Sequence, residues 1–148
     1  MPAKKLFTIG HTQDSFVRTL QKNKVKMLVD VRRHPGSAYK PDFSKNRLAD
    51  ALRQHGIDYR HMPGVAPTAE VRRQEKKGEI GRSELLAAYE AELVSHLDEV
   101  DELRDLAKRK TTCLMCLEKD AHECHRQVLG RNVVKRSRRR LRLEDIGA

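Results

Sequence analysis

Short runs of apolar residues recur along the chain, and each is followed by polar or turn-forming residues. A run of about four to eight apolar residues with such boundaries is typical of a strand buried on both faces, whereas a half-exposed strand alternates. The run at 57–62 alternates, and the other runs are continuous. The pattern therefore predicts strands at residues 6–9, 27–31, 57–62 and 111–116.

Segments with apolar residues three or four positions apart separate these runs, which is the spacing of one helix face. The pattern predicts helices at about 14–22, 44–56, 83–106 and 124–135. Ser44 is a suitable N-terminal cap for the second helix, and Gly56 stands where its C-terminal cap is expected. The third helix is long enough that we expect a break near Ser95 or Asp98.

Strands that alternate with helices and are apolar on both faces indicate βαβ units and a parallel sheet. We therefore expect a three-layer, Rossmann-like α/β fold, in which helices cover both faces of an open, mostly parallel sheet. Residues 1–148 are expected to form a single domain with an irregular insertion at 65–82 and a short helix around 71–77. The basic segment 135–148 is predicted to carry an edge strand at 141–146, through which two subunits could pair as a homodimer.

The composition is that of a globular protein of the cytoplasm. The chain has 148 residues, of which 38% are hydrophobic and 35% are charged. No apolar stretch approaches the roughly 20 residues of a membrane-spanning helix, and the first apolar run is too short for a signal peptide. The three cysteines are expected to be thiols or metal ligands rather than disulfides. We therefore expect a cytoplasmic protein without a membrane partner.

The charge is strongly positive and unevenly distributed. The net charge is +10, and five of the six residues at 135–140 are Lys or Arg. Such a surface attracts phosphate, so the predicted partner is nucleic acid or a nucleotide. A solvated basic tail is the alternative explanation.

Polar residues follow the predicted strands at their carboxyl ends. His11 and Thr12 follow the first strand, Asp30 and Arg32 stand at the end of the second, and residues 116–126 follow the fourth. The carboxyl ends of parallel strands meet at one edge of a sheet, where ligands bind in open α/β folds. We therefore expect these residues to converge at that edge.

Nine of the eleven residues at 116–126 are ionisable or nucleophilic. The segment leads into a predicted helix, whose first turn offers free N–H groups and the positive end of the helix dipole. An anion could bind there, held by Arg126 and Lys119. Glu118 and His125 are the acid–base candidates of this segment. The alternative is a solvated loop that follows a buried, structural Cys116.

The cysteines of this region have two chemical interpretations. The helix dipole and the basic surroundings would favour the thiolate of Cys124, so that Cys124 or Cys116 could act as a nucleophile. Zinc is the second interpretation. However, Cys113 and Cys116 would point to opposite faces of a strand, and the adjacent Cys124 and His125 suit one tetrahedral site poorly. We therefore predict neither a metal nor a cofactor.

Other strand-end residues also have more than one interpretation. Asp30 could be a general base or accept a hydrogen bond from a ribose hydroxyl. It could equally form an internal ion pair with Arg32, which would point to the same side of a strand. His11 is a candidate proton shuttle or a helix cap. Tyr39 could stack on a base or order its own loop.

Three sequence motifs occur in a fixed order along the chain. They are residues 9–12 (IGHT), residues 28–32 (LVDVR) with Pro35 and Ser37, and Cys116-x-Glu118-Lys119-Asp120 with residues 124–126. Together they resemble the family called domain of unknown function 488 (DUF488), over about residues 6–134. The resemblance implies a compact α/β fold with a site at the strand ends. It names no activity, although the motif residues look like those of an enzyme.

The leading hypothesis is an enzyme that acts on nucleic acid or a nucleotide, by hydrolysis or base excision. The roles fall to three pairs: Asp30 or Glu118 would activate water, Arg32 and Arg126 would hold phosphate, and His11 or His125 would move a proton. The first alternative is a non-catalytic module that binds nucleic acid or phosphate through Arg126 and residues 135–142. The second is a cysteine-dependent enzyme acting on a small metabolite.

Overall fold

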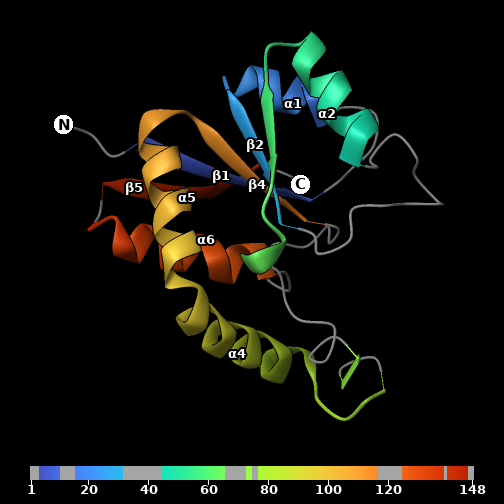
Figure 1. Ribbon diagram of the computed structural model, residues 1–148, viewed down its shortest axis with the longest axis vertical. Helices are drawn as coiled ribbons and strands as arrows, with labels where there is room; N and C mark the ends of the chain where they lie inside the picture. Colours follow the sequence, from blue (N-terminus) through green and yellow to red (C-terminus); the bar gives the residue numbers. More distant parts are fainter. Residues whose placement is uncertain are drawn as a thin grey trace.

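The structure, a computed structural model, describes residues 4–10, 16–31, 45–65, 73–74, 77–116, 125–138 and 140–146. Its centre is a five-stranded sheet in the order β3-β2-β4-β1-β5 (Figure 1). The strands are β1 (Lys4–Gly10), β2 (Met27–Asp30), β3 (Asp58–His61), β4 (Thr112–Cys116) and β5 (Leu141–Asp145). Every pairing is parallel, so the expected parallel sheet and the edge strand near the carboxyl terminus are both confirmed.

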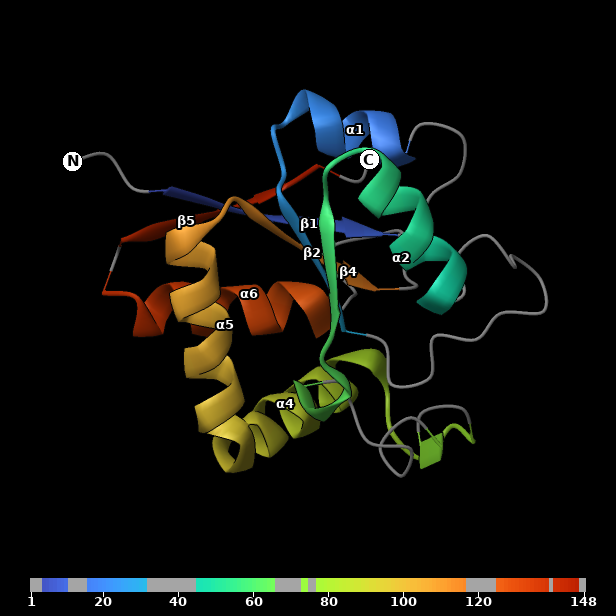
Figure 2. The ribbon, with the colours of Figure 1, turned by 45° about the horizontal axis from the view of Figure 1, so that its top comes forward.

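Helices cover both faces of the sheet (Figure 2). On one face lie α1 (Phe16–Lys22) and α2 (Lys45–Gln54), and on the other lie α4 (Arg82–Leu93), α5 (Leu97–Arg109) and α6 (His125–Arg136). The predicted three-layer α/β fold is therefore confirmed. No helix in the described part of the chain combines the length and the apolar character needed to cross a bilayer.

The inner strands β2 and β4 are buried on both faces because helices cover both faces of the sheet. In β2, Leu28 belongs to the apolar cluster under α1 and α2, whereas its neighbour Val29 belongs to the cluster under α4, α5 and α6. Both side chains are fully buried. Leu20 and Leu52 bring α1 and α2 onto the Leu28 side. A continuous apolar run, rather than an alternating one, follows from this two-sided burial.

One helix break and one helix end lie where the sequence predicts them. A 3₁₀ turn at Val94–His96 separates α4 from α5. Gly56, which follows α2, has a φ of 73°, the left-handed conformation that glycine adopts without steric cost. The chain then returns directly into β3.

Half of the predicted insertion at 65–82 lies outside the described residues, which include 65, 73–74 and 77–82. Its first residue, Val65, ends the short 3₁₀ turn at Pro63–Val65 and is fully buried. The Tyr89 hydroxyl of α4 donates a hydrogen bond of 2.5 Å to the Val65 carbonyl oxygen. Burial raises the pKa of Tyr89 well above its ordinary value, so this hydroxyl remains a donor. The contact fixes α4 against the end of β3.

An ion-pair cluster joins α5 to α6. The Arg136 guanidinium donates hydrogen bonds to both carboxylate oxygens of Asp101, one of them at 2.8 Å. Arg104 adds a contact of 3.2 Å to the same carboxylate. The hydrogen bond from Arg136 is the main cause that lowers the pKa of Asp101 from its ordinary value of 3.8. Ionised Asp101 therefore stabilises the packing of the two helices.

We predict that Asp101→Asn lowers the free energy of unfolding by about 1 kcal/mol at neutral pH, because a charge-assisted pair at a partly exposed site is lost. The pKa of Asp101 is lower in the folded protein, so its contribution is present above 3.8 and is lost as the pH falls through the folded-state pKa. Urea unfolding of both proteins at neutral and acid pH measures this difference, which should narrow in acid. In an Arg136→Gln background the same substitution should cost less. A difference that is independent of pH contradicts the assignment.

Candidate functional site

The last residues of β1, β2, β3 and β4 form one edge of the sheet, which we call the carboxyl edge: Gly10, Asp30, His61 and Cys116. Gly10 is the register partner of Cys116, and Asp30 is level with both Met115 of β4 and His61 of β3. Neighbouring strands are about 4.8 Å apart. The expected convergence of strand ends is therefore present in the backbone.

The connections from this edge leave in opposite directions. The chain runs from β1 to α1 and from β2 to α2, which cover one face, whereas it runs from β4 to α6 on the other face. The strand β4 lies between β1 and β2. Ligands of open α/β sheets bind where neighbouring connections diverge in this way. The topology thus makes the end of β4 the centre of the candidate site.

Asp30 is the predicted site residue that the structure describes most fully. Its carboxylate is fully buried and accepts a hydrogen bond of 2.5 Å from the Tyr59 hydroxyl. Its backbone is held on both sides, because the Asp30 carbonyl accepts from Met62 N–H at 3.0 Å and Val31 N–H donates to Met115 at 3.0 Å.

Tyr59 and His61 lie on the same face of β3, two residues apart. Both are half-buried, while the alternate residues Asp58 and Arg60 are exposed. His61 is the register partner of Asp30. The strand ends thus bring a carboxylate, a phenol and an imidazole to one corner of the carboxyl edge. Tyr59 was missed from the sequence, although the alternation at 57–62 already places it on the side of His61.

The first turn of α6 also belongs to the carboxyl edge, because α6 follows β4. Its backbone N–H groups have no carbonyl partner within the helix, and they lie at the positive end of the helix dipole. The Oε1 atom of Gln127, in the same turn, is buried and has no hydrogen-bond partner among the residues that the structure describes. Such atoms are uncommon in folded proteins. Gln127 is a second residue that sequence reasoning missed, and no sequence signal distinguishes it.

The remaining predicted site residues fall at or beyond the limits of the described chain. For Cys116, which ends β4, and for His125 and Arg126, which begin α6, the backbone alone is described. The others lie outside the described residues: His11, Thr12, Arg32, Tyr39, Glu118, Lys119 and Cys124. Their convergence with Asp30 stays a prediction. Cys113, in contrast, is a buried thiol in the apolar cluster under α1 and α2.

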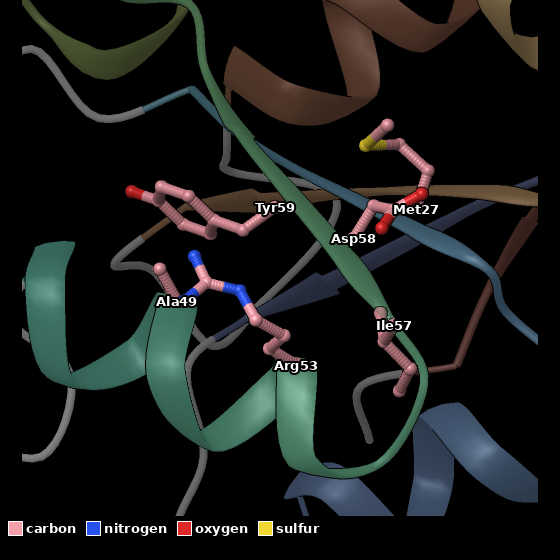
Figure 3. A pocket seen from close by; sticks show the side chains of 6 residues that line it. All are labelled: Met27, Ala49, Arg53, Ile57, Asp58 and Tyr59. Atoms are coloured by element: carbon pink, nitrogen blue, oxygen red, sulfur yellow. The ribbon is translucent and has the colours of Figure 1, made fainter.

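A hollow of about 410 Å³ lies between α2 and β3 (Figure 3). Tyr59 forms part of its wall, with Arg53 and Ala49 of α2. Its other lining residues are Met27, Ile57 and Asp58, at the beginnings of β2 and β3. The hollow is therefore displaced toward the opposite end of the strands, and it is not the carboxyl-edge site.

Residues 135–142 lie at the other end of α6 from Arg126. Arg126 and Arg136 are ten positions apart in α6, which corresponds to about 15 Å along the helix axis. The basic end of α6 and the carboxyl edge thus lie at opposite ends of the strands. Within the described residues, no group of three or more His, Cys, Asp and Glu side chains could hold a metal ion.

An open parallel sheet with helices on both faces and polar residues at one strand edge defines an α/β protein of Rossmann-like architecture. Within that class, the chain belongs to the family described as Domain of unknown function DUF488, whose model matches residues 12–133. The resemblance seen in the sequence motifs is therefore confirmed. No curated protein and no solved structure matches the chain.

We predict that Tyr59→Phe lowers the free energy of unfolding by about 1–3 kcal/mol, because the buried Asp30 carboxylate loses a donor. A double-mutant cycle with Asp30→Asn, followed by urea unfolding, isolates this interaction. Tyr89→Phe is the matched control, since its hydroxyl donates to a neutral carbonyl and should cost less. Additive effects of Tyr59→Phe and Asp30→Asn would show that the hydrogen bond contributes nothing.

Proposed function

We propose that the protein is an enzyme that hydrolyses a nucleotide or nucleic acid substrate at the carboxyl edge, with base excision as the first reaction to test. The observation that carries this proposal is the Asp30–Tyr59 pair, a fully buried carboxylate hydrogen-bonded at the topological switch of a parallel sheet. Buried ionisable groups at strand ends are typical of active sites.

Phosphate would bind at the first turn of α6, where free N–H groups and the helix dipole favour an anion. Arg126 belongs to that turn, and Arg32 follows β2 in the sequence. The Oε1 atom of Gln127, which has no partner among the described residues, supports a ligand here, because a bound hydroxyl or amine would donate a hydrogen bond to it. Thr12, Tyr39 and Lys119 would complete the substrate contacts.

The proton transfers are divided between two kinds of residue. Glu118 would activate the attacking water, and His11 or His125 would protonate the leaving group. Asp30 is fully buried and held by Tyr59, so it is better suited to fix a substrate group or to take a proton inside a closed site. Cys116 and Cys124 have no step in this mechanism.

We predict that Asp30→Asn and Glu118→Gln each lower kcat by at least about 10²-fold, the usual contribution of an acid–base group. The assay incubates the protein with labelled nucleotides and with oligonucleotides, and it measures the release of free base and of phosphate. Asp98→Asn is the matched control, since it makes the same chemical change at an exposed position of α5. Unchanged turnover in both site variants would show that the carboxylates are not catalytic.

We also predict that Gln127→Met stabilises the free protein while it weakens substrate binding. Replacing a side chain whose buried amide oxygen has no partner among the described residues by an apolar side chain of similar size removes a desolvation cost of about 1 kcal/mol. Urea unfolding should therefore show a higher free energy of unfolding. The KM of a substrate identified by the assay of labelled nucleotides and oligonucleotides should rise. A variant that is less stable than the natural protein would mean that Gln127 is held by contacts within the chain.

A further inference from the structure

Basic residues stand where the strands begin, at the edge of the sheet opposite the carboxyl edge. We call this side the amino edge and define it by eight residues: Lys4, Lys24, Lys26, Lys108, Arg109, Lys110, Arg138 and Arg140. They open or directly precede β1, β2, β4 and β5. Figure 2 shows α5 and α6 ending on the side where β1, β4 and β5 begin.

Backbone hydrogen bonds bring these residues into one row. Lys26 N–H donates to the Thr111 carbonyl at 2.8 Å, and Lys4 N–H donates to the Arg140 carbonyl at 3.1 Å. The Lys4 Nζ atom donates to the Lys108 carbonyl at 3.0 Å. Residues from four separate segments of the chain therefore share this edge.

Within the described part of the chain, most of this charge is not neutralised. Lys24, Lys26, Arg109, Arg138 and Arg140 are exposed, and none forms an ion pair with another described residue. The nearby acids already have partners. Asp58 accepts from Lys110 at 2.8 Å, and Asp105 accepts from Arg104 at 3.0 Å.

The helix dipole accounts for only part of the row. Cations in the last turn of a helix stabilise its negative end, and Lys108 and Arg109 of α5 have that position. The effect falls off within one turn. Lys26 lies four residues beyond the end of α1, and Arg140 lies four residues beyond the end of α6. Their exposed charges have no such structural explanation.

We propose that the amino edge binds the phosphate backbone of a nucleic acid duplex without sequence preference. The three spacings between the four strands β2, β4, β1 and β5 make the row about 14 Å long, which is the axial rise of about four nucleotides in a strand of B-DNA. The row lacks the aromatic side chains on which single strands stack, because the described aromatics, Phe7, Phe16, Tyr59 and Tyr89, are buried or half-buried elsewhere.

A membrane fits this edge less well. Membrane-surface binding combines basic residues with exposed apolar side chains that enter the lipid. Among the described residues the exposed large hydrophobics are Val94 and Leu97. Leu97 begins α5 and Arg109 ends it, so these apolar residues lie about 18 Å from the row.

This surface is separate from the carboxyl edge and goes beyond the proposed function. The seven residues of β1 put about 20 Å between the two edges. A duplex on the amino edge therefore does not occupy the carboxyl edge. The protein would remain anchored to the duplex whatever the carboxyl edge hydrolyses, so either proposal can fail without the other.

The test compares two triple variants in binding to a fluorescein-labelled duplex, measured by anisotropy at several salt concentrations. The edge variant carries Lys26→Gln, Arg109→Gln and Arg140→Gln. The control variant removes three exposed charges elsewhere, by Arg18→Gln, Lys77→Gln and Arg131→Gln. We expect the edge variant to bind at least about tenfold more weakly and to reduce the slope of log Kd against log salt by two to three. The control should bind nearly as the natural protein does.

Several results would overturn the proposal. Equal weakening in both variants would mean that net charge alone drives binding. Weakening by Arg126→Gln but not by the edge variant would place the nucleic acid at the carboxyl edge. Edge-dependent binding to phosphatidylserine vesicles, without binding to duplex, would assign the edge to a membrane.

A chemical measurement keeps the test independent of variant folding. Lysine acetylation of the natural protein, with and without unlabelled duplex, should show protection of Lys26 and not of Lys77. In a second variant, Lys26→Arg together with Arg140→Lys should retain binding, because phosphate contact requires the charge rather than the side chain. Loss of binding in this variant, or equal protection of both lysines, contradicts the proposal.

Discussion

Parallel pairing of β4 with both β1 and β2 is the constraint on which the rest of the structure depends. It aligns Gly10 with Cys116 and Asp30 with Met115, and it makes β4 the central strand. A central strand with helices on both faces must be apolar throughout, which Cys113, Leu114 and Met115 satisfy at 0% exposure. The polar residues that follow β4 are therefore confined to its end.

The same parallel arrangement separates two kinds of chemistry. All strands begin at one edge and end at the other, so residues that precede strands never mix with residues that follow them. The eight cations of the amino edge open or closely precede strands, whereas Asp30, His61 and the first turn of α6 stand at the strand ends. The net charge of such a protein therefore does not indicate at which edge an anionic ligand binds. The charge of these eight residues lies at the edge opposite the candidate site.

Periodicity was sufficient to predict the helices and strands, because each apolar pattern reports local burial. The break at Val94–His96 and the left-handed Gly56 follow from local rules in the same way. The order of the strands in the sheet does not follow from local rules, because a continuously apolar run does not indicate which strands lie beside it. For the same reason the sequence joined Arg126 with residues 135–142 into one surface, although α6 carries them to opposite edges. Tyr59 and Gln127 were identified as site residues only from the structure. Tyr59 donates a hydrogen bond to Asp30, and Gln127 has a buried oxygen without a partner among the described residues.

The carboxylate of Asp30 is fully buried at the end of β2. Burying a carboxylate costs several kcal/mol, and the hydrogen bond from Tyr59 is one of the contacts that offset this cost. The preceding residues of β2, Met27, Leu28 and Val29, are apolar, and an apolar residue at position 30 would continue their pattern at lower cost. The fully buried carboxylate of Asp30, beside its register partner His61, is thus a departure from the apolar pattern of the core. Such departures are expected at functional sites, and this one lies at the edge where open α/β sheets bind their ligands.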